Sequence, residues 1–204
     1  MKPHEIEKES FRIILSEMKE HSFTAQELMT VQRVIHATAD FEYQDLIRFS
    51  PQAISRAIAA IRSGAPVFSD VQMIAAGVSK NLMNNYGMQI SCLVSDPRVV
   101  ELAKDEGVTR SQTAMTLLGN ELNDAIILIG NAPTALFEVL RLYRQESVRP
   151  AFIVGVPVGF VNAVESKAAL METNLDYITV EGRKGGSTVA VAIFNALLRL
   201  AGEA

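Results

Sequence analysis

Short runs of apolar residues alternate with longer segments of mixed polarity through most of the chain. Residues 125–129 and 151–154 are apolar at every position, which is typical of strands buried on both faces of a parallel sheet. Further runs at 66–68, 89–94 and 177–180 are also interpreted as strands, and helical segments separate them. The pattern therefore predicts an α/β protein with a three-layer, doubly wound, mainly parallel sheet, helices on both of its faces and an N-terminal helical segment.

A well-anchored helix is predicted to begin at Thr24. Thr24 and Glu27 have the spacing of a capping box, and Phe23 and Leu28 have the spacing of a hydrophobic staple. At about 100° per residue, His36 lies at the edge of the apolar face of this helix. It is therefore expected where the core meets a cleft. The alternative is a histidine that only packs against its neighbours, which is the commoner role of a lone histidine beside an apolar stripe.

The other helices are predicted from their caps and periodicity. An amphipathic N-terminal helix is expected over residues 3–21, with Ser10 on its apolar side. The Ser10 hydroxyl either donates to a carbonyl of the preceding turn or is directed into a cleft. Ser50 and residues 69–70 are predicted to cap two further helices. The remaining helices are predicted over residues 96–104, 109–122, 134–145, 163–171 and from 187 onward.

Three glycine-bearing segments each follow a predicted strand and precede a predicted helix. They are residues 130–134, 155–160 and 182–187. In a parallel sheet such segments meet at the carboxyl ends of the strands, where ligands bind. Their glycines allow close approach of a ligand, and the helix N-termini behind them are expected to offer free N–H groups to anions. This argument selects three candidate ligand contacts, which are Asn131, Gly159 and Ser187.

Composition and charge narrow the class of protein. The chain has 204 residues, of which 49% are hydrophobic, and we expect one domain over residues 1–204. A net charge of −4 argues against binding nucleic acid through its phosphates. Cys92 is the only cysteine, which excludes an internal disulfide, and we expect it to be buried and inert. No apolar stretch approaches the length of a membrane span, so a cytoplasmic protein without membrane contact is predicted.

Few side chains remain for chemistry. The sequence shows no nucleophile elbow, no pair of His or Cys residues at metal-ligand spacing, no P-loop and no full dinucleotide fingerprint. What is left is His36, some hydroxyl groups, and cations near the predicted rim of the sheet. Arg110 stands at a helix start, where a cation is unfavourable unless an anion joins it, so a bound carboxylate or phosphate is predicted there. Residues 165–167 are predicted to be a solvated helix surface.

Several motifs together resemble the precorrin-8X methylmutase family, which includes the cobalt-precorrin-8 enzymes. The resemblance spans essentially the whole chain. The most specific block is Pro-Val-Gly-Phe-Val-Asn-Ala at residues 157–163, followed by Glu-Ser-Lys at 165–167. The other motifs are Val-Ile-His-Ala-Thr-Ala-Asp (34–40), Asp-Val-Gln-Met (70–73), Thr-Arg-Ser (109–111), Gly-Asn-Ala-Pro-Thr-Ala-Leu (130–136) and Gly-Arg-Lys-Gly-Gly-Ser (182–187).

The resemblance implies an isomerase that moves a methyl group between adjacent ring carbons of a polycarboxylated tetrapyrrole. The product would be hydrogenobyrinate or cobyrinate, no cofactor would be consumed, and the substrate itself could carry cobalt. The resemblance further implies a homodimer with the active site at or near the subunit interface. It assigns His36 as the catalytic proton or hydrogen-bond donor, with Ser10 and Arg110 as ligand contacts. The helix C-terminus and Asp40, one turn beyond His36, are expected to favour the charged imidazolium.

Two other functions stay open from the residues alone. A non-catalytic tetrapyrrole carrier would keep the pocket and the anion sites but would not need His36. A nucleotide-dependent enzyme would use the strand-end glycines for a pyrophosphate, although the fingerprint for such a site is missing.

Overall fold

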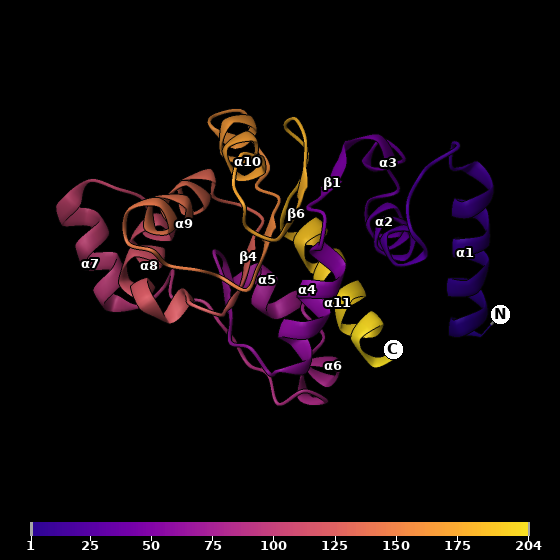
Figure 1. The fold of residues 1–204 in the computed structure, drawn as a ribbon, viewed down its shortest axis with the longest axis horizontal. Helices are drawn as coiled ribbons and strands as arrows, with labels where there is room; N and C mark the ends of the chain where they lie inside the picture. The colour runs from indigo at the N-terminus through magenta and orange to yellow at the C-terminus, as the bar shows by residue number, and fades with distance from the viewer. Residues whose placement is uncertain (1, 204) are drawn as a thin grey trace.

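The computed structural model describes residues 2–203, and only the backbone for Pro3 (Figure 1). A six-stranded sheet in the order β1-β6-β5-β4-β2-β3 forms its centre. Neighbouring strands are parallel, except that β1 runs antiparallel to β6. The predicted α/β class is confirmed. The strands are β1 (Ile47–Phe49), β2 (Val67–Ser69), β3 (Ile90–Ser91), β4 (Ile126–Ile129), β5 (Phe152–Gly155) and β6 (Tyr177–Val180).

Helices cover both faces of the sheet and give the predicted three layers (Figure 1). On one face, α11 (Ser187–Glu203) lies against β4 and β5. Packed on α11 are α2 (Ala25–Thr38), α4 (Ala53–Arg62), α5 (Gln72–Gly77) and α6 (Lys80–Asn84). The other face carries α8 (Arg110–Leu118), α9 (Pro133–Gln145) and α10 (Ala163–Met171), with α7 (Pro97–Glu106) outside α8.

Strand β4 shows why some runs are apolar at every position. Ile126 and Leu128 belong to the core cluster under α11, whereas Ile127 and Ile129 belong to the cluster under α9. All four side chains are fully buried. Because alternate residues of a strand point to opposite faces, a strand covered by helices on both sides must be apolar at both sets of positions.

Helix α2 begins where its sequence predicts. The Thr24 hydroxyl accepts a hydrogen bond from the Glu27 N–H, and the Glu27 carboxylate accepts one from the Thr24 N–H. Ala39 follows the helix with a φ of 52°, in the left-handed region that ends many helices. A short helix, α3 (Tyr43–Leu46), connects α2 to β1.

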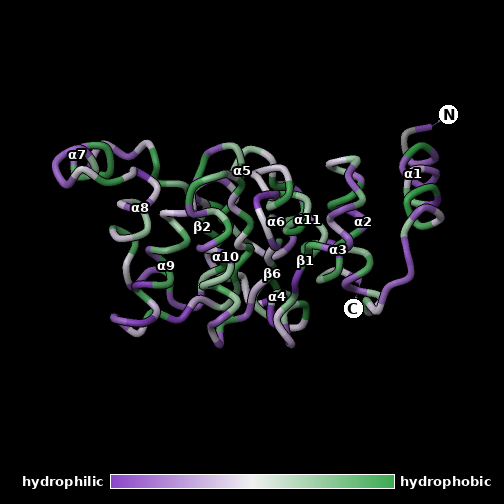
Figure 2. Tube along the Cα trace, turned by 90° about the horizontal axis from the view of Figure 1, so that it is seen from above, coloured by the Kyte–Doolittle hydropathy of each residue, from purple (hydrophilic) through white to green (hydrophobic). Residues whose placement is uncertain are grey.

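Helix α1 (Pro3–Glu17) lies at one end of the molecule, outside α2, and α7 lies at the other end (Figures 1 and 2). It stops before the predicted residue 21 because the buried Gln44 side chain binds the chain that follows. The Gln44 amide donates to the Lys19 carbonyl and accepts from the Lys19 N–H, at 2.9 and 3.1 Å. These bonds replace the helical bonds that Lys19 would otherwise make.

Three further local predictions are wrong, and one strand was not predicted. Strand β1 was not predicted, and only Ile90 and Ser91 of the 89–94 run form a strand. Ser50 does not cap α4, whose N-cap is Gln52. The Ser50 hydroxyl instead accepts a hydrogen bond from the Tyr177 N–H at 3.0 Å. The helix predicted over 109–122 ends at Leu118, and a 3-10 helix, η1 (Gly119–Leu122), completes the segment.

Candidate active site

His36 lies in the last turn of α2 with an exposed side chain. Its ring stacks on Phe11 of α1, with 5.1 Å between ring centroids and 27° between ring planes. The Arg33 guanidinium lies 4.4 Å from the Phe11 ring centroid and forms an ion pair with Glu7. The imidazole is therefore supported by Phe11 and remains accessible to solvent. His36 is thus not part of the core, although it does pack against a neighbour, and its catalytic role stays a prediction.

A groove leads from His36 along the surface of α11. A hollow of about 220 Å³ beside His36 adjoins one of about 230 Å³ beside Ser187, and Thr188 and Val191 line both. We call the two together the α2–α11 groove. Its lining residues are Arg33, His36, Ala37, Thr188, Val191, Ala192, Asn195 and Arg199 at one end, and Met73, Gly77 and Ser187 at the other.

The groove combines apolar walls with cations. Ala37, Val191 and Ala192 line it without charge, and the guanidinium groups of Arg33 and Arg199 stand beside His36. The hydrogen bond from Arg33 holds the pKa of the Glu7 carboxyl below its usual value. The nearby charges of Arg33, Arg199 and His36 lower it further. A mixture of apolar surface and guanidinium groups suits a ligand with a large apolar body and carboxylate substituents.

The 182–187 loop, which ends at Ser187, is tied tightly to the neighbouring strand end. The Gly186 N–H donates to the Val156 carbonyl at 2.9 Å, and the Gly159 N–H donates to the Arg183 carbonyl at 3.1 Å. Gly185 has a φ of 147°, and a Cβ atom there would stand 2.2 Å from the Val156 oxygen. The 182–187 loop is thus in direct contact with the 155–160 segment, and only glycine fits between them. The 130–134 segment reaches the same loop, because a Cβ atom at Gly130 would stand 2.8 Å from the Ser187 Cα atom.

Lys184 connects this loop to the end of the His36 helix. Its ammonium forms an ion pair with Asp40 and a second one, at 2.9 Å, with Glu42. The hydrogen bond from Lys184 lowers the pKa of the Asp40 carboxyl. The Asp40 carboxylate is therefore bound by Lys184, and its expected effect on the His36 imidazolium stays a prediction.

Asp70 occupies the third predicted anion site. Its buried carboxylate accepts hydrogen bonds from the N–H groups of Gly130, Asn131 and Ala132 at 3.2, 2.9 and 2.6 Å. Burial raises the pKa of Asp70, and the three N–H donors oppose that rise. From the sequence, the 130–134 turn was expected to offer free N–H groups to a ligand. This expectation is wrong for Gly130, Asn131 and Ala132, because the Asp70 carboxylate already binds their N–H groups. Asp70 also does not cap α5, whose N-cap is Val71.

Arg110 and Asn131 have exposed side chains and lie in the two segments that contact Asp70. Ser111, next to Arg110, donates to the Asp70 carbonyl at 3.3 Å, and the hydroxyl groups of Thr109 and Thr134 are 2.7 Å apart. Within residues 2–203 Arg110 makes no ion pair. Its guanidinium at the start of α8 is free to bind an anionic group.

Ser10 and Gly159 lie away from the walls of the α2–α11 groove. The Ser10 hydroxyl donates to the Ile6 carbonyl at 2.9 Å, which is the first of its two predicted roles, although its oxygen can still accept a hydrogen bond. Beyond Gly159, the Phe160 side chain is 86% exposed, and the Arg183 guanidinium lies 5.4 Å from its ring centroid. The structure thus brings His36 and Ser187 to one groove and places Arg110 with Asn131 at the sheet rim.

Comparison with known proteins decides the family. A family model described as precorrin-8X methylmutase matches residues 5–200. The chain belongs to the precorrin-8X methylmutase family. It is 47% identical over 206 residues to a cobalt-precorrin-8 methylmutase of Leptospira interrogans, which covers 97% of this chain and 94% of that protein. It is 40% identical over 192 residues to a precorrin-8X methylmutase of Sinorhizobium sp, covering 93% and 91% of the two chains.

The fold agrees with a solved structure of the same family. The crystal structure of a precorrin-8X methylmutase from Thermus thermophilus superposes with a TM-score of 0.91 at 44% identity, covering 98% of this chain and 97% of that one. The family predicted from the motifs is therefore confirmed, and this methylmutase is an isomerase of cobalamin biosynthesis.

One methylmutase motif lies where the sequence did not predict it. Ser166 and Lys167 on α10 are buried, with exposed fractions of 0% and 1%, and not solvated. The Lys167 ammonium donates to the Lys184 carbonyl at 2.6 Å, beneath the 182–187 loop. Helical spacing offered a signal that was missed, because Ala163, Ser166, Lys167 and Leu170 follow the i, i+3, i+4, i+7 pattern of a buried stripe.

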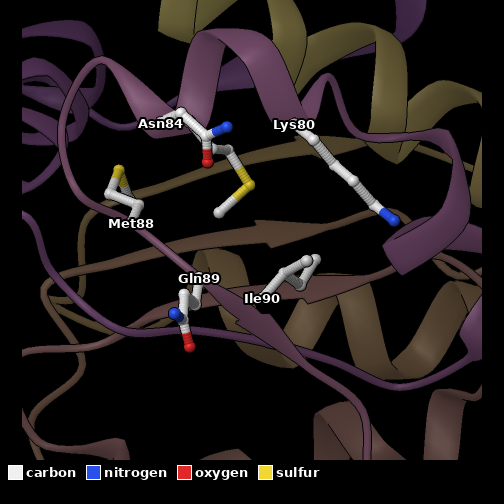
Figure 3. Close-up of a pocket in the computed structure, with 6 residues that line it drawn as sticks. Lys80, Asn84, Met88, Gln89 and Ile90 are labelled. Carbon is white, nitrogen blue, oxygen red and sulfur yellow. The ribbon is translucent and has the colours of Figure 1, made fainter.

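A separate hollow of about 290 Å³ lies between α6 and β3 (Figure 3). In that view the Lys80 side chain extends away from Asn84, Met88 and Gln89, so its ammonium does not point toward them. None of the residues that line this hollow also lines the α2–α11 groove. It offers amide and thioether groups but no titratable group at its centre, so we do not assign the methylmutase reaction to it.

Two further observations concern the described residues only. Among residues 2–203, no three His, Cys, Asp or Glu side chains are grouped so that they could hold a metal ion. No helix in that part of the methylmutase combines the length and the apolar character needed to cross a bilayer.

Proposed function

We propose that the chain binds precorrin-8X or cobalt-precorrin-8 against the α2–α11 groove and moves a methyl group between adjacent ring carbons. The product is hydrogenobyrinate or cobyrinate. The observation that carries this proposal is the exposed His36 imidazole at the end of a groove with apolar walls and guanidinium groups. Cobalt, where present, belongs to the substrate and is held by the ring nitrogens.

His36 acts on the macrocycle as a proton or hydrogen-bond donor. The methyl group leaves one ring carbon as its bond to the neighbouring carbon forms, and the π electrons of the ring shift accordingly. Donation from an imidazole stabilises the shifted electron distribution. Because an isomerisation changes no composition, any proton that His36 gives is returned when the product forms.

The substrate carboxylates account for the remaining candidates. Arg199 lies in the groove and Arg110 at the rim, and each can bind a carboxylate through two parallel hydrogen bonds. Asn131 and Ser187 provide further donors. Gly159 lies outside the groove walls, and its contact with the substrate stays a prediction. The flat apolar body of the macrocycle covers the alanine and valine side chains of the groove.

The test is incubation with each form of the substrate while following the absorption change on isomerisation. His36→Ala is expected to lower turnover by about a hundredfold or more while binding is retained, which is the upper part of the usual range for one acid–base group. His21→Ala is the matched control, because His21 is exposed and lies outside the groove. Full turnover by His36→Ala would contradict the role given to His36.

The carrier alternative makes the opposite prediction. A binding protein would release the substrate unchanged, and His36→Ala would not alter that result. The methylmutase relatives give this alternative no support.

We further propose that α1 takes part in a homodimer. Ile6 and Ile13 are seven residues apart on one side of α1 and are 53% and 41% exposed. Ser10 lies between them on the same side. Helix α1 packs mainly on α2 and stands at the end of the molecule (Figures 1 and 2). A second copy covering this side would bury both isoleucines and bring Ser10 to the interface.

Sedimentation velocity tests the dimer. The wild-type chain is expected at twice its mass of 22.3 kDa, and Ile13→Glu is expected to shift it to the monomer. Leu102→Glu on α7 is the control, because Leu102 is 38% exposed at the opposite end of the molecule. A monomeric wild type, or a dimer that tolerates Ile13→Glu, would contradict this interface.

We also propose that the enzyme works as one domain in the cytoplasm. The family match over residues 5–200 supports one domain, and a single half-buried cysteine, Cys92, whose pKa burial raises, suits a reducing compartment. Fractionation of cells that express the protein tests its location.

A further inference from the structure

Lys167 is a buried cation without a buried counter-charge. Its side chain is 1% exposed, and its ammonium donates to one backbone atom, the Lys184 carbonyl oxygen, at 2.6 Å. Within residues 2–203 it makes no ion pair with a carboxylate. Taking an ammonium group out of water is costly unless it is paired, so this position is unfavourable for stability by itself.

The residue that Lys167 contacts, Lys184, is linked to both ends of the groove. Lys184 belongs to the 182–187 loop, and the last residue of that loop, Ser187, lines the groove. The Lys184 ammonium binds Asp40, which lies four residues beyond His36. A continuous series of polar contacts therefore runs from α10 through the loop to the end of α2.

The loop needs such a restraint because its backbone is rich in glycine. Gly185 and Gly186 have φ values of 147° and 120°, which glycine reaches without cost but which it does not hold by itself. The hydrogen bond from Lys167 fixes the carbonyl immediately before these two residues.

We propose that Lys167 is a positioning residue for the methyl migration: by holding the Lys184 carbonyl it fixes the 182–187 loop and, through the Lys184–Asp40 ion pair, the end of α2 that carries His36. This inference rests on the proposed catalytic role of His36. Lys167 itself does not contact the substrate, because it is buried beneath the loop.

The first test compares kinetics with stability. Lys167→Met keeps the length and apolar stem of the side chain and removes the ammonium. It is expected to lower kcat about ten- to a hundredfold, the effect of a small misplacement of a reacting group, with KM changed less than threefold. Its melting temperature is expected to equal or exceed that of the wild type. Lys80→Met, a Lys-to-Met change on exposed α6, is the control and is expected to change neither value.

The second test is independent of activity. With labelled histidine, the His36 imidazole signals are expected to shift in Lys167→Met and in Asp40→Asn, but not in Lys80→Met. The Gly186 amide is expected to exchange faster with solvent in Lys167→Met, because the loop has lost one of its restraints. Asp40→Asn breaks the series of contacts at its exposed end, and it tests the same link if Lys167→Met does not fold.

The outcomes separate this inference from the proposed function. Unchanged His36 signals in both variants, or an unchanged kcat in Lys167→Met, would overturn the positioning role. A fully active His36→Ala enzyme would instead overturn the catalytic role of His36, whatever the signals of Lys167→Met show.

Discussion

Asp70 and Lys167 are buried charged side chains whose partners are backbone groups of loops at the sheet rim. Each satisfies polar atoms in a segment that cannot form helical or strand hydrogen bonds. Asp70 fixes the turn after β4, and Lys167 fixes the loop after β6. At the scale of single residues, two buried charged side chains therefore fix the backbone of the loops at the rim of the sheet.

Asp70→Asn is expected to destabilise the fold. The Asp70 carboxylate has two acceptor oxygens that receive three N–H groups, and an asparagine replaces one oxygen with a donor facing those groups. The loss is expected to be about 2 kcal/mol, the cost of leaving buried donors unpaired. Urea denaturation measures it, with Asp105→Asn on exposed α7 as the control. Equal losses in the two variants would show that the carboxylate is not needed.

Lys167 is expected to make stability rise with pH above 8. Burial lowers the pKa of its ammonium from 10.5 to about 8. Between these values the unfolded chain binds the proton and the folded chain does not, so the free energy of unfolding increases with pH, by up to about 3 kcal/mol for this group. Denaturation curves from pH 7 to 10.5 should show this rise in the wild type. Lys167→Met should lack it, and parallel curves would contradict the prediction.

At the scale of elements, prediction from sequence succeeded where local signals are strong. The capping box of α2 and the apolar runs of β4 to β6 gave the helix start and strands within a residue or two. Strand β1 failed because Ile47, Arg48 and Phe49 form a strand only through pairing with distant β6. The run at 89–94 was overestimated for the same reason, since β3 is an edge strand whose length depends on β2.

The candidate site divides in the same way. His36 was predicted at a cleft edge from helical periodicity and family resemblance, and the structure places it beside the groove. Asp70, Lys167 and Lys184 were assigned other roles or none, because their partners are far apart in sequence. Lys184, for example, binds a carboxylate 144 residues away. Periodicity within one element contains no information about such contacts.

Gly185 tests how closely two rim segments must approach. Gly185→Ala would place a Cβ atom 2.2 Å from the Val156 oxygen and requires a φ of 147°. It is expected to lower stability by about 3 kcal/mol, since overpacking and backbone strain add. Gly107→Ala is the control, because its φ of 67° is also positive but nothing lies within 4 Å of the new Cβ, so about 1 kcal/mol is expected. Thermal unfolding compares them. Similar losses in the two variants would mean that the close approach does not matter.

At the scale of the whole molecule, charge is distributed unevenly. The chain has a net charge of −4, yet Arg33 and Arg199 line the groove and Arg110 and Arg183 are exposed near the rim. A polycarboxylate substrate is therefore repelled by the protein as a whole and attracted by this one region. If the substrate binds at the groove as proposed, the local field and not the net charge directs it to His36.

Salt is therefore expected to weaken substrate binding and to leave the chemical step unaffected. The screening length falls from about 10 Å at 0.1 M salt to about 3 Å at 1 M, so the attraction between substrate carboxylates and the groove cations weakens. KM is expected to rise several-fold over this range, with kcat nearly constant.

Arg199→Gln should raise KM at low salt and flatten its salt dependence, because it removes a groove cation. Arg98→Gln is the control, since Arg98 pairs with Asp96 on distant α7 and should leave both unchanged. A KM that does not respond to salt in the wild type would show that the substrate is held by its apolar body, and the guanidinium groups of the groove would then need another role.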